Sequence, residues 1–290
     1  MPSHTQRPLS EFHMTASTTD FSSISFIGGG NMANALITGL LNRGTPAAHI
    51  QVVEPLASSR QHLIDQLGVR AIPQADDSLP SSPLVVWAIK PQLFKEVATP
   101  LKALFPEALH LSVAAGIRSD SIAQWLGTER VVRAMPNTPA LVGLGQTGLY
   151  ARGAVNADER QRVEALMDAV GQSIWVARED LLDAVTAVSG SGPAYVFYVL
   201  EAMVAAGVRM GLSPEQAHQL AVGTLVGASE LARASSEPPA VLRERVTSKG
   251  GTTYAAISSM QADGVAGLIE KAMHAAKDRA QSLGEELGGA

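Results

Sequence analysis

Small residues at a fixed spacing form a candidate phosphate-binding turn near the start of the chain. Gly28, Gly30 and Ala33 occupy the positions of a G-x-G-x-x-A fingerprint after the apolar run Ile24–Ile27. In such a turn the first glycine bends the chain, the second lets the backbone approach a pyrophosphate, and the third small residue permits close helix–strand packing. The N–H groups at the start of the following helix attract phosphates. The spacing therefore predicts a dinucleotide site, with an ordinary tight turn as the alternative.

A second loop carries hydroxyl side chains on both sides of paired glycines. It runs from Val246 to Tyr254 and reads V-T-S-K-G-G-T-T-Y. Because a helix is expected from about Thr253, backbone N–H groups and short hydroxyl donors could together hold a small anion. The order of residues is not that of a Walker A loop. Spacing alone leaves anion binding and a flexible capped turn equally open.

The residues after the second predicted strand give conflicting signals about the cofactor. Glu54 ends the strand Ile50–Glu54, where an acidic residue typically bonds the adenosine ribose hydroxyls and favours NAD over NADP. Ser58, Ser59 and Arg60 follow closely, and hydroxyls with a guanidinium suit a 2′-phosphate instead. The preference between the two cofactors stays open.

Two further strand ends carry candidate binding residues. Lys90 and Pro91 follow the strand Leu84–Ile89, and Asn137 follows the strand Arg130–Ala134. Ligands in open α/β sheets bind beyond the carboxyl ends of the strands, so these residues are expected beside a bound dinucleotide. Each segment could also be an ordinary proline-stiffened turn.

The elements that position these residues fall into two regions. Apolar strands alternate with amphipathic helices up to about Val176, which predicts an α/β, Rossmann-type dinucleotide-binding domain over residues 21–180. The pattern is helical afterwards and predicts an all-helical domain over residues 181–290. Residues 1–20 are polar and are expected to be a disordered tail. Ala194–Met210 is apolar nearly all round, so we expect it to be buried at a subunit interface.

Composition excludes several classes of protein. The 290 residues carry a formal charge of −5 without a long basic run, which argues against a nucleic-acid partner. There is no cysteine, which fits a cytoplasmic location and removes Cys-based metal sites. His218 has no second ligand arranged beside it, so no metal is expected. The apolar runs are too short or too broken by polar residues to predict a membrane span.

Six segments, in chain order, resemble pyrroline-5-carboxylate reductases, and the resemblance extends over about residues 24–280. They are Ile27–Ala33, Ala88–Gln92, Val113–Ile117, Met135–Pro139, Gly190–Phe197 and Val246–Thr253.

The resemblance implies an activity and a set of site residues. The activity is the reduction of Δ1-pyrroline-5-carboxylate to L-proline with NADPH or NADH, in a homodimer or a larger assembly of dimers. The resemblance also implies that the all-helical region, residues 181–290, is the substrate-binding and dimerisation domain. The family match assigns the Thr253 hydroxyl to the substrate ring nitrogen as the catalytic group. The implied substrate-binding residues are Ser248, Gly250, Gly251, Thr252 and Thr253. The cofactor-binding residues, from the match and from the spacing together, are Gly28, Gly30, Asn31, Met32, Glu54, Ser58, Arg60, Ala88, Lys90, Pro91 and Asn137.

One departure from the family keeps alternatives open. Family members commonly have a proline before the paired glycines, where this chain has Lys249. Lysine restores an N–H group and adds a positive charge, which suits either a tuned affinity or a related cyclic-imine reductase. A non-catalytic NAD(P)-binding regulator is a further alternative. A β-hydroxyacid reductase is disfavoured, because Asp183–Met210 contains no lysine to serve as its catalytic residue.

Overall fold

The computed structural model describes residues 22–76, 79 and 82–288 in two compact units. The first unit contains the chain up to Leu182 together with the segment from Leu283 onward, and the second contains Asp183–Ser282. The predicted tail, residues 1–20, lies outside the described residues. The domain ranges 21–180 and 181–290 stay predictions, although the end of the last helix packs with the first unit.

The first unit is built on a sheet with the order β3-β2-β1-β4-β5-β6-β7-β8 among the described residues. Its strands are β1 Ile24–Ile27, β2 Ile50–Val53, β3 Arg70–Ile72, β4 Leu84–Trp87, β5 Leu109–Ser112, β6 Val131–Met135, β7 Gly145–Ala151 and β8 Gly171–Trp175. Its helices are α1 Asn31–Asn42, α2 Ala57–Leu67, α3 Phe94–Leu101, α4 Ser119–Leu126 and α5 Ala157–Met167. This is the predicted Rossmann-type arrangement.

The sheet separates two hydrophobic cores. Along β4, Leu84 and Val86 pack into the core shared with α1, α2 and α5, whereas Val85 and Trp87 pack into the core shared with α3 and α4. Successive side chains of a strand point to opposite faces, so a strand covered on both faces must be apolar throughout. This explains why continuous apolar runs, rather than alternating ones, mark the strands in the sequence.

Strand β7 differs from the rest of the sheet, because it runs antiparallel to β6. The connection from Met135 to Gly145 holds only the 3₁₀ segment Thr138–Val142. A parallel return needs a crossover of roughly a dozen residues or more. The β/α alternation predicted from the sequence therefore breaks here, and β8 resumes it by pairing parallel to β7.

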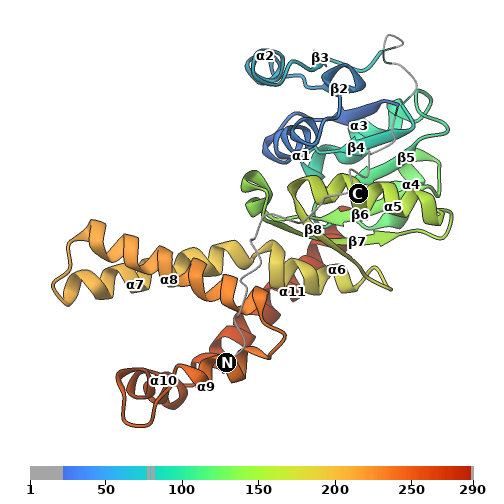
Figure 1. Ribbon diagram of the computed structural model, residues 1–290. Coiled ribbons are helices and arrows are strands. Elements are labelled where there is room, and N and C mark those ends of the chain that lie inside the picture. The colour runs from blue at the N-terminus through green and yellow to red at the C-terminus, as the bar shows by residue number, and fades with distance from the viewer. Residues whose placement is uncertain (1–21, 77–78, 80–81, 289–290) are drawn as a thin grey trace, which may run out of the picture. The chain divides into compact units, whose positions relative to one another are not determined.

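The second unit is helical, with α7 and α8 lying side by side (Figure 1). Its helices are α6 Leu181–Val185, α7 Gly192–Arg209, α8 Pro214–Ala234, α9 Pro239–Arg245, α10 Thr252–Ala262 and α11 Val265–Gly288. Local sequence features explain two of the helix boundaries. The Ser189–Pro193 break coincides with the end of a π-helical turn, Thr186–Gly190, and Ser213 caps α8 in a capping box with Gln216.

Among the described residues, one helical segment is long and apolar enough to cross a membrane, judged by length and composition only. On these two criteria, the expectation that every apolar run is too short or too broken by polar residues is wrong. The helical segment Leu181–Arg209 has 29 residues and contains an 18-residue stretch with a mean hydropathy of 1.3. The single chain also leaves much of α7 exposed, including Phe197 and Tyr198 at 59% and 74%. One chain alone therefore does not bury this helix, and its predicted burial at a subunit interface stays a prediction.

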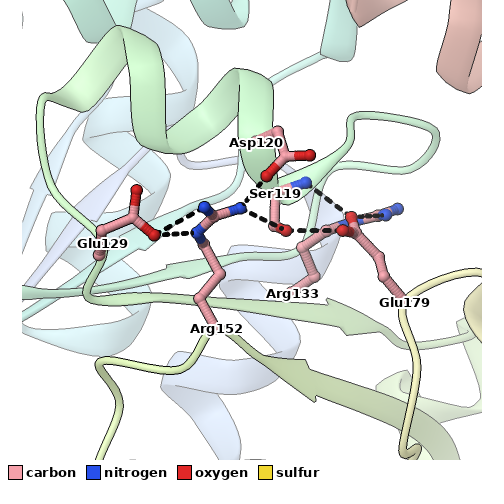
Figure 2. Close-up of polar contacts among 6 residues, drawn as sticks. All are labelled: Ser119, Asp120, Glu129, Arg133, Arg152 and Glu179. Carbon is pink, nitrogen blue, oxygen red and sulfur yellow. Dashed lines mark hydrogen bonds and ion pairs between the residues drawn. The ribbon is translucent and has the colours of Figure 1, made fainter.

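A polar network fixes the segment that leads out of the sheet (Figure 2). The Glu179 carboxylate accepts hydrogen bonds from the Ser119 N–H and hydroxyl at 2.6 Å each, and pairs with Arg133 at 2.5 Å. Arg152 donates to the same hydroxyl at 3.2 Å and pairs with Asp120 and Glu129. A carboxylate at the first turn of α4 is favoured by the helix dipole, so Glu179 ties the chain after β8 to the Rossmann unit.

Replacing Glu179 should therefore destabilise the Rossmann unit. Arg133 has a side chain only 6% exposed, and Glu179→Ala removes the carboxylate that neutralises it. Breaking a buried pair on one side costs about 3–5 kcal/mol. Urea unfolding would measure this loss. The exposed neighbour Asp180 is the control, and Asp180→Ala should leave the unfolding midpoint nearly unchanged. Equal midpoints for the two variants would contradict the assigned role of Glu179.

A second prediction concerns His110, which is 1% exposed and accepts a hydrogen bond from the Trp87 indole N–H at 3.0 Å. Burial, with a smaller effect of the Arg130 charge, lowers the pKa of His110 to about 4, although a hydrogen bond that the imidazole donates to the Phe105 backbone opposes this shift. The unfolded chain, with an ordinary histidine pKa of about 6.5, then binds the proton more tightly. The folded state should lose about 2 kcal/mol of stability between pH 7.5 and pH 5 from this group alone.

Urea unfolding at the two pH values measures this dependence. His110→Gln keeps an acceptor for the indole but cannot titrate, so its free energy of unfolding should depend less on pH over this interval. The same pH dependence in both proteins would rule out His110 as the source.

Candidate functional site

The glycine turn after β1 has no room for a side chain at its first position. Gly28 has a φ of +99°, and a Cβ atom there would lie 2.5 Å from the carbonyl oxygen of Ala88. Its N–H donates to the Val53 carbonyl at 2.8 Å. The turn is thus held against the end of β2 and packed on the end of β4, as the fingerprint predicts.

The next two glycines differ from each other. A Cβ atom at Gly29 would lie 2.7 Å from Leu63 Cδ1, whereas nothing lies within 4 Å of one at Gly30. Gly30 is the N-cap of α1 and has no side chain to cap the helix. The first N–H groups of a helix have no partner within it, so the open space at Gly30 suits a phosphate. Asn31 is exposed and Met32 half-buried in the same first turn.

Gly29 and Asn34 also shape this turn, although the fingerprint spacing did not predict a role for either residue. The Asn34 side-chain amide donates to the carbonyl oxygens of Gly29 at 2.8 Å and Gly30 at 3.1 Å. Asn34 follows Gly29 and Gly30 by five and four residues, a spacing within one helical turn. The sequence therefore contained a local signal for these hydrogen bonds. The contact between Gly29 and Leu63 depends on tertiary packing and has no local signal.

Glu54 faces the glycine turn rather than standing free at the strand end. Its carboxylate oxygens accept hydrogen bonds from the Gly29 and Leu56 N–H groups at 2.8 Å each. The Arg60 guanidinium donates to the backbone carbonyls of Glu54 and Pro55 at 2.9 and 2.6 Å. Both side chains therefore hold the turn from β2 to α2, and their roles in cofactor binding stay predictions.

A cavity of about 670 Å³ lies beside this turn. Gly29, Gly30 and Asn31 line it on one side, and Ser58, Ser59 and His62 line it from α2. Ser58 was predicted from the sequence. His62 was not, although its position three residues after Ser59 on a helix could have revealed it.

The other strand-end residues are placed as follows. Ala88 is half-buried against Gly28, and Lys90 is exposed as the N-cap of the 3₁₀ turn that begins at Pro91. Asn137 is 7% exposed and its side-chain oxygen accepts a hydrogen bond from the Gln146 N–H at 2.9 Å. Asn137 therefore anchors the start of β7, and a contact with the cofactor stays a prediction for all four residues.

The paired-glycine loop forms a compact turn in the second unit. Gly250 has a φ of +75°, and the Gly251 N–H donates to the Ser248 carbonyl at 3.0 Å. A Cβ atom at Gly251 would lie 2.7 Å from the Ser248 hydroxyl oxygen. Gly251 is the N-cap of α10 without a side-chain cap, and Thr252 and Thr253 form the first turn. The loop thus gathers hydroxyls and N–H groups at one helix start, an arrangement suited to a carboxylate.

Lys249 lies at the edge of a separate cavity of about 390 Å³, which Arg243, Glu244 and Tyr254 also line. Among the described residues, no group of three or more histidine or acidic side chains is arranged to hold a metal ion. The two groups of predicted site residues therefore lie one in each unit, the nucleotide group on the sheet and the paired-glycine group on α10.

Comparisons with known proteins agree with this division. Residues 179–283 match the family model described as pyrroline-5-carboxylate reductase dimerisation, and residues 23–116 match the model described as NADP oxidoreductase, coenzyme F420-dependent.

Similar proteins extend over almost the whole chain. The pyrroline-5-carboxylate reductase of Pseudomonas aeruginosa is 46% identical over 91% of this chain and 98% of its own, and that of Pasteurella multocida is 40% identical over 90% and 97%. The solved reductase of Coxiella burnetii is 38% identical with a TM-score of 0.86 over 90% of this chain and 98% of its own. The Plasmodium falciparum reductase, solved with NADP bound, is 26% identical with a TM-score of 0.80 over the same shares. As its motifs predict, the chain belongs to the pyrroline-5-carboxylate reductase family.

Proposed function

We propose that the chain reduces Δ1-pyrroline-5-carboxylate to L-proline with a hydride from NADPH or NADH. The observation that carries this proposal is the family relationship over nine tenths of the chain, at 46% identity. The conformations of the glycine turn and the paired-glycine loop support it, because each provides the donors that the reaction needs.

The cofactor, when bound, supplies the hydride for the C=N carbon. We assign its pyrophosphate to the open space at Gly30 and to the N–H groups of Asn31 and Met32 in the first turn of α1. Glu54 keeps lone pairs for the ribose hydroxyls, since each of its carboxylate oxygens accepts one backbone hydrogen bond and can accept another. Ala88, Lys90, Pro91 and Asn137 are assigned to the nicotinamide half, beyond the strand ends.

The substrate is an imine that carries a carboxylate. We assign the carboxylate to the Ser248 hydroxyl and to the N–H groups of residues 250–253, which lie together at the start of α10. The Thr253 hydroxyl is assigned to the ring nitrogen, which it orients while the nitrogen carries its proton. A protonated imine is already electrophilic, so positioning of the ring against the hydride donor supplies much of the rate.

A subunit partner is part of the proposal. Residues 179–283 match a dimerisation family, and α7 exposes the apolar side chains of Val196, Phe197 and Met203 in the single chain. We propose a homodimer, or an assembly of dimers, in which these side chains are covered. The absence of cysteine fits a cytoplasmic location, which we propose as well.

The assay that tests the function follows NADPH and NADH oxidation at 340 nm with pyrroline-5-carboxylate as substrate. The wild-type chain should turn over. Thr253→Ala should lower kcat/KM about tenfold or more, because it removes one positioned polar contact. Thr253→Ser, which keeps the hydroxyl, should recover most of this loss.

Two results would contradict the assignment. No turnover by protein that binds the cofactor would favour another cyclic imine or a non-catalytic role, and Lys249→Pro would then be the first variant to assay. Wild-type kinetics in Thr253→Ala would remove Thr253 from the site.

The proposed interface predicts a change of mass. Light scattering at micromolar concentration should give at least twice the 30.3 kDa of one chain. Phe197→Asp should lower this mass by placing a charge on the apolar face of α7. The control Ile174→Asp, at an exposed apolar residue of β8 outside the matched dimerisation region, should not. A wild-type mass of a single chain would overturn the proposal.

A further inference from the structure

The cavity beside the glycine turn has a lining suited to an anion. Ser58, Ser59 and His62 line it from the first two turns of α2, where residues three and four apart share a face. Among the described residues that line this cavity there is no aspartate or glutamate, and His62 is the only titratable side chain. Hydroxyl and imidazole donors therefore face the cavity without an opposing carboxylate.

Glu54 and Arg60, whose charges favour NADH and NADPH respectively, do not line this cavity. The Arg60 guanidinium donates to the carbonyls of Glu54 and Pro55, which directs it into the turn between β2 and α2. The Glu54 carboxylate accepts hydrogen bonds from the Gly29 and Leu56 N–H groups. Both are engaged by backbone groups, and neither side chain lines the cavity, so neither is placed to contact a ligand there directly.

The cavity also has the right neighbours for one part of a dinucleotide. It is lined by Gly29 and Gly30, where the pyrophosphate is assigned, and it continues to the start of α2. In dinucleotide-binding folds the adenosine ribose lies between the glycine turn and the end of the second strand. A phosphate on that ribose would reach the residues that follow the second strand, which here are those of α2.

We propose that Ser58, Ser59 and His62, and not Arg60, bind the 2′-phosphate of NADPH and thereby set the preference for NADPH over NADH. This inference rests on the proposed function. His62 acts as a specificity-determining residue, and Glu54 acts as a positioning residue that holds Gly29 while its carboxylate stays outside the lining of the cavity.

The first experiment measures binding without catalysis. Calorimetry would give the Kd of 2′,5′-ADP, which carries the 2′-phosphate, and of 5′-AMP, which lacks it. The wild-type chain should bind 2′,5′-ADP more tightly. His62→Ala should weaken 2′,5′-ADP relative to 5′-AMP about tenfold, the loss expected for one hydrogen bond to a charged group. The double variant Ser58→Ala with Ser59→Ala should shift the same ratio in the same direction.

Two control variants make the assignment specific. His49→Ala removes another exposed histidine of the same unit, from the 3₁₀ turn before β2, and should leave the ratio unchanged. Arg60→Ala can loosen the turn and weaken both ligands, but it should not change their ratio. A ratio that falls in Arg60→Ala and stays at the wild-type value in His62→Ala would overturn the inference. Competition by inorganic phosphate as effective as that by 2′,5′-ADP would point to a free-phosphate site instead.

Kinetics separate this inference from the proposed function. The ratio of kcat/KM for NADPH to that for NADH should fall about tenfold in His62→Ala. Wild-type turnover with an unchanged ratio in His62→Ala would refute the assignment of the 2′-phosphate and leave the reductase activity standing. An absence of wild-type turnover with either cofactor would instead refute the proposed function.

Discussion

The close approach of two strand ends at Gly28 is the constraint on which the nucleotide half of the molecule depends. A Cβ atom at this position would lie 2.5 Å from the Ala88 carbonyl oxygen, a backbone atom that cannot rotate away. The same approach lets Gly28 bond to Val53 and lets Ala88 bond to Ile27, so the ends of β1, β2 and β4 are joined at one point. Because α1 starts directly after this turn, its free N–H groups are directed over the edge of the sheet. The anion-binding geometry thus follows from how tightly the sheet closes.

Two carboxylates complete this architecture by binding backbone N–H groups. Glu54 accepts from Gly29 and so joins the glycine turn to the start of α2, whereas Glu179 accepts from Ser119 and joins the chain beyond β8 to the start of α4. Each oxygen of an ionised carboxylate can accept more than one hydrogen bond. A group that positions the backbone can therefore still receive a ligand hydroxyl, and the structural and binding roles of Glu54 do not exclude each other. What the structure changes is the location of the negative charge, which points into the turn and not into the cavity lined by His62.

Much of the fold could be predicted because its determinants are local in sequence. Apolar runs marked the buried strands, Gly44 and Gly68 follow the ends of their helices with positive φ, and Ser213 with Gln216 marked the start of α8. The antiparallel β7 could not be predicted from its own residues, since its direction follows from the short connection after Asn137. The hydrogen bonds from Gly29 to Glu54 and from Gln146 to Asn137 could not be predicted either, because they join residues 25 and 9 positions apart and leave no periodic signal. Residue types at strand ends predicted the course of the chain around the glycine turn better than they predicted which atom each side chain contacts.

The composition of α7 does not by itself show what surrounds the helix. By hydropathy alone, Leu181–Arg209 resembles a membrane span. Within the chain, one side of α7 packs closely on α8, where a Cβ atom at the buried Gly207 would lie 3.0 Å from Ala217. Small residues at this contact let the two helices approach and leave Phe197, Tyr198 and Val199 on exposed surface. A helix that is already paired on one side and apolar on the other is suited to a second protein surface. Residues 179–283 match a dimerisation family, which supports a second copy of the same chain as the partner.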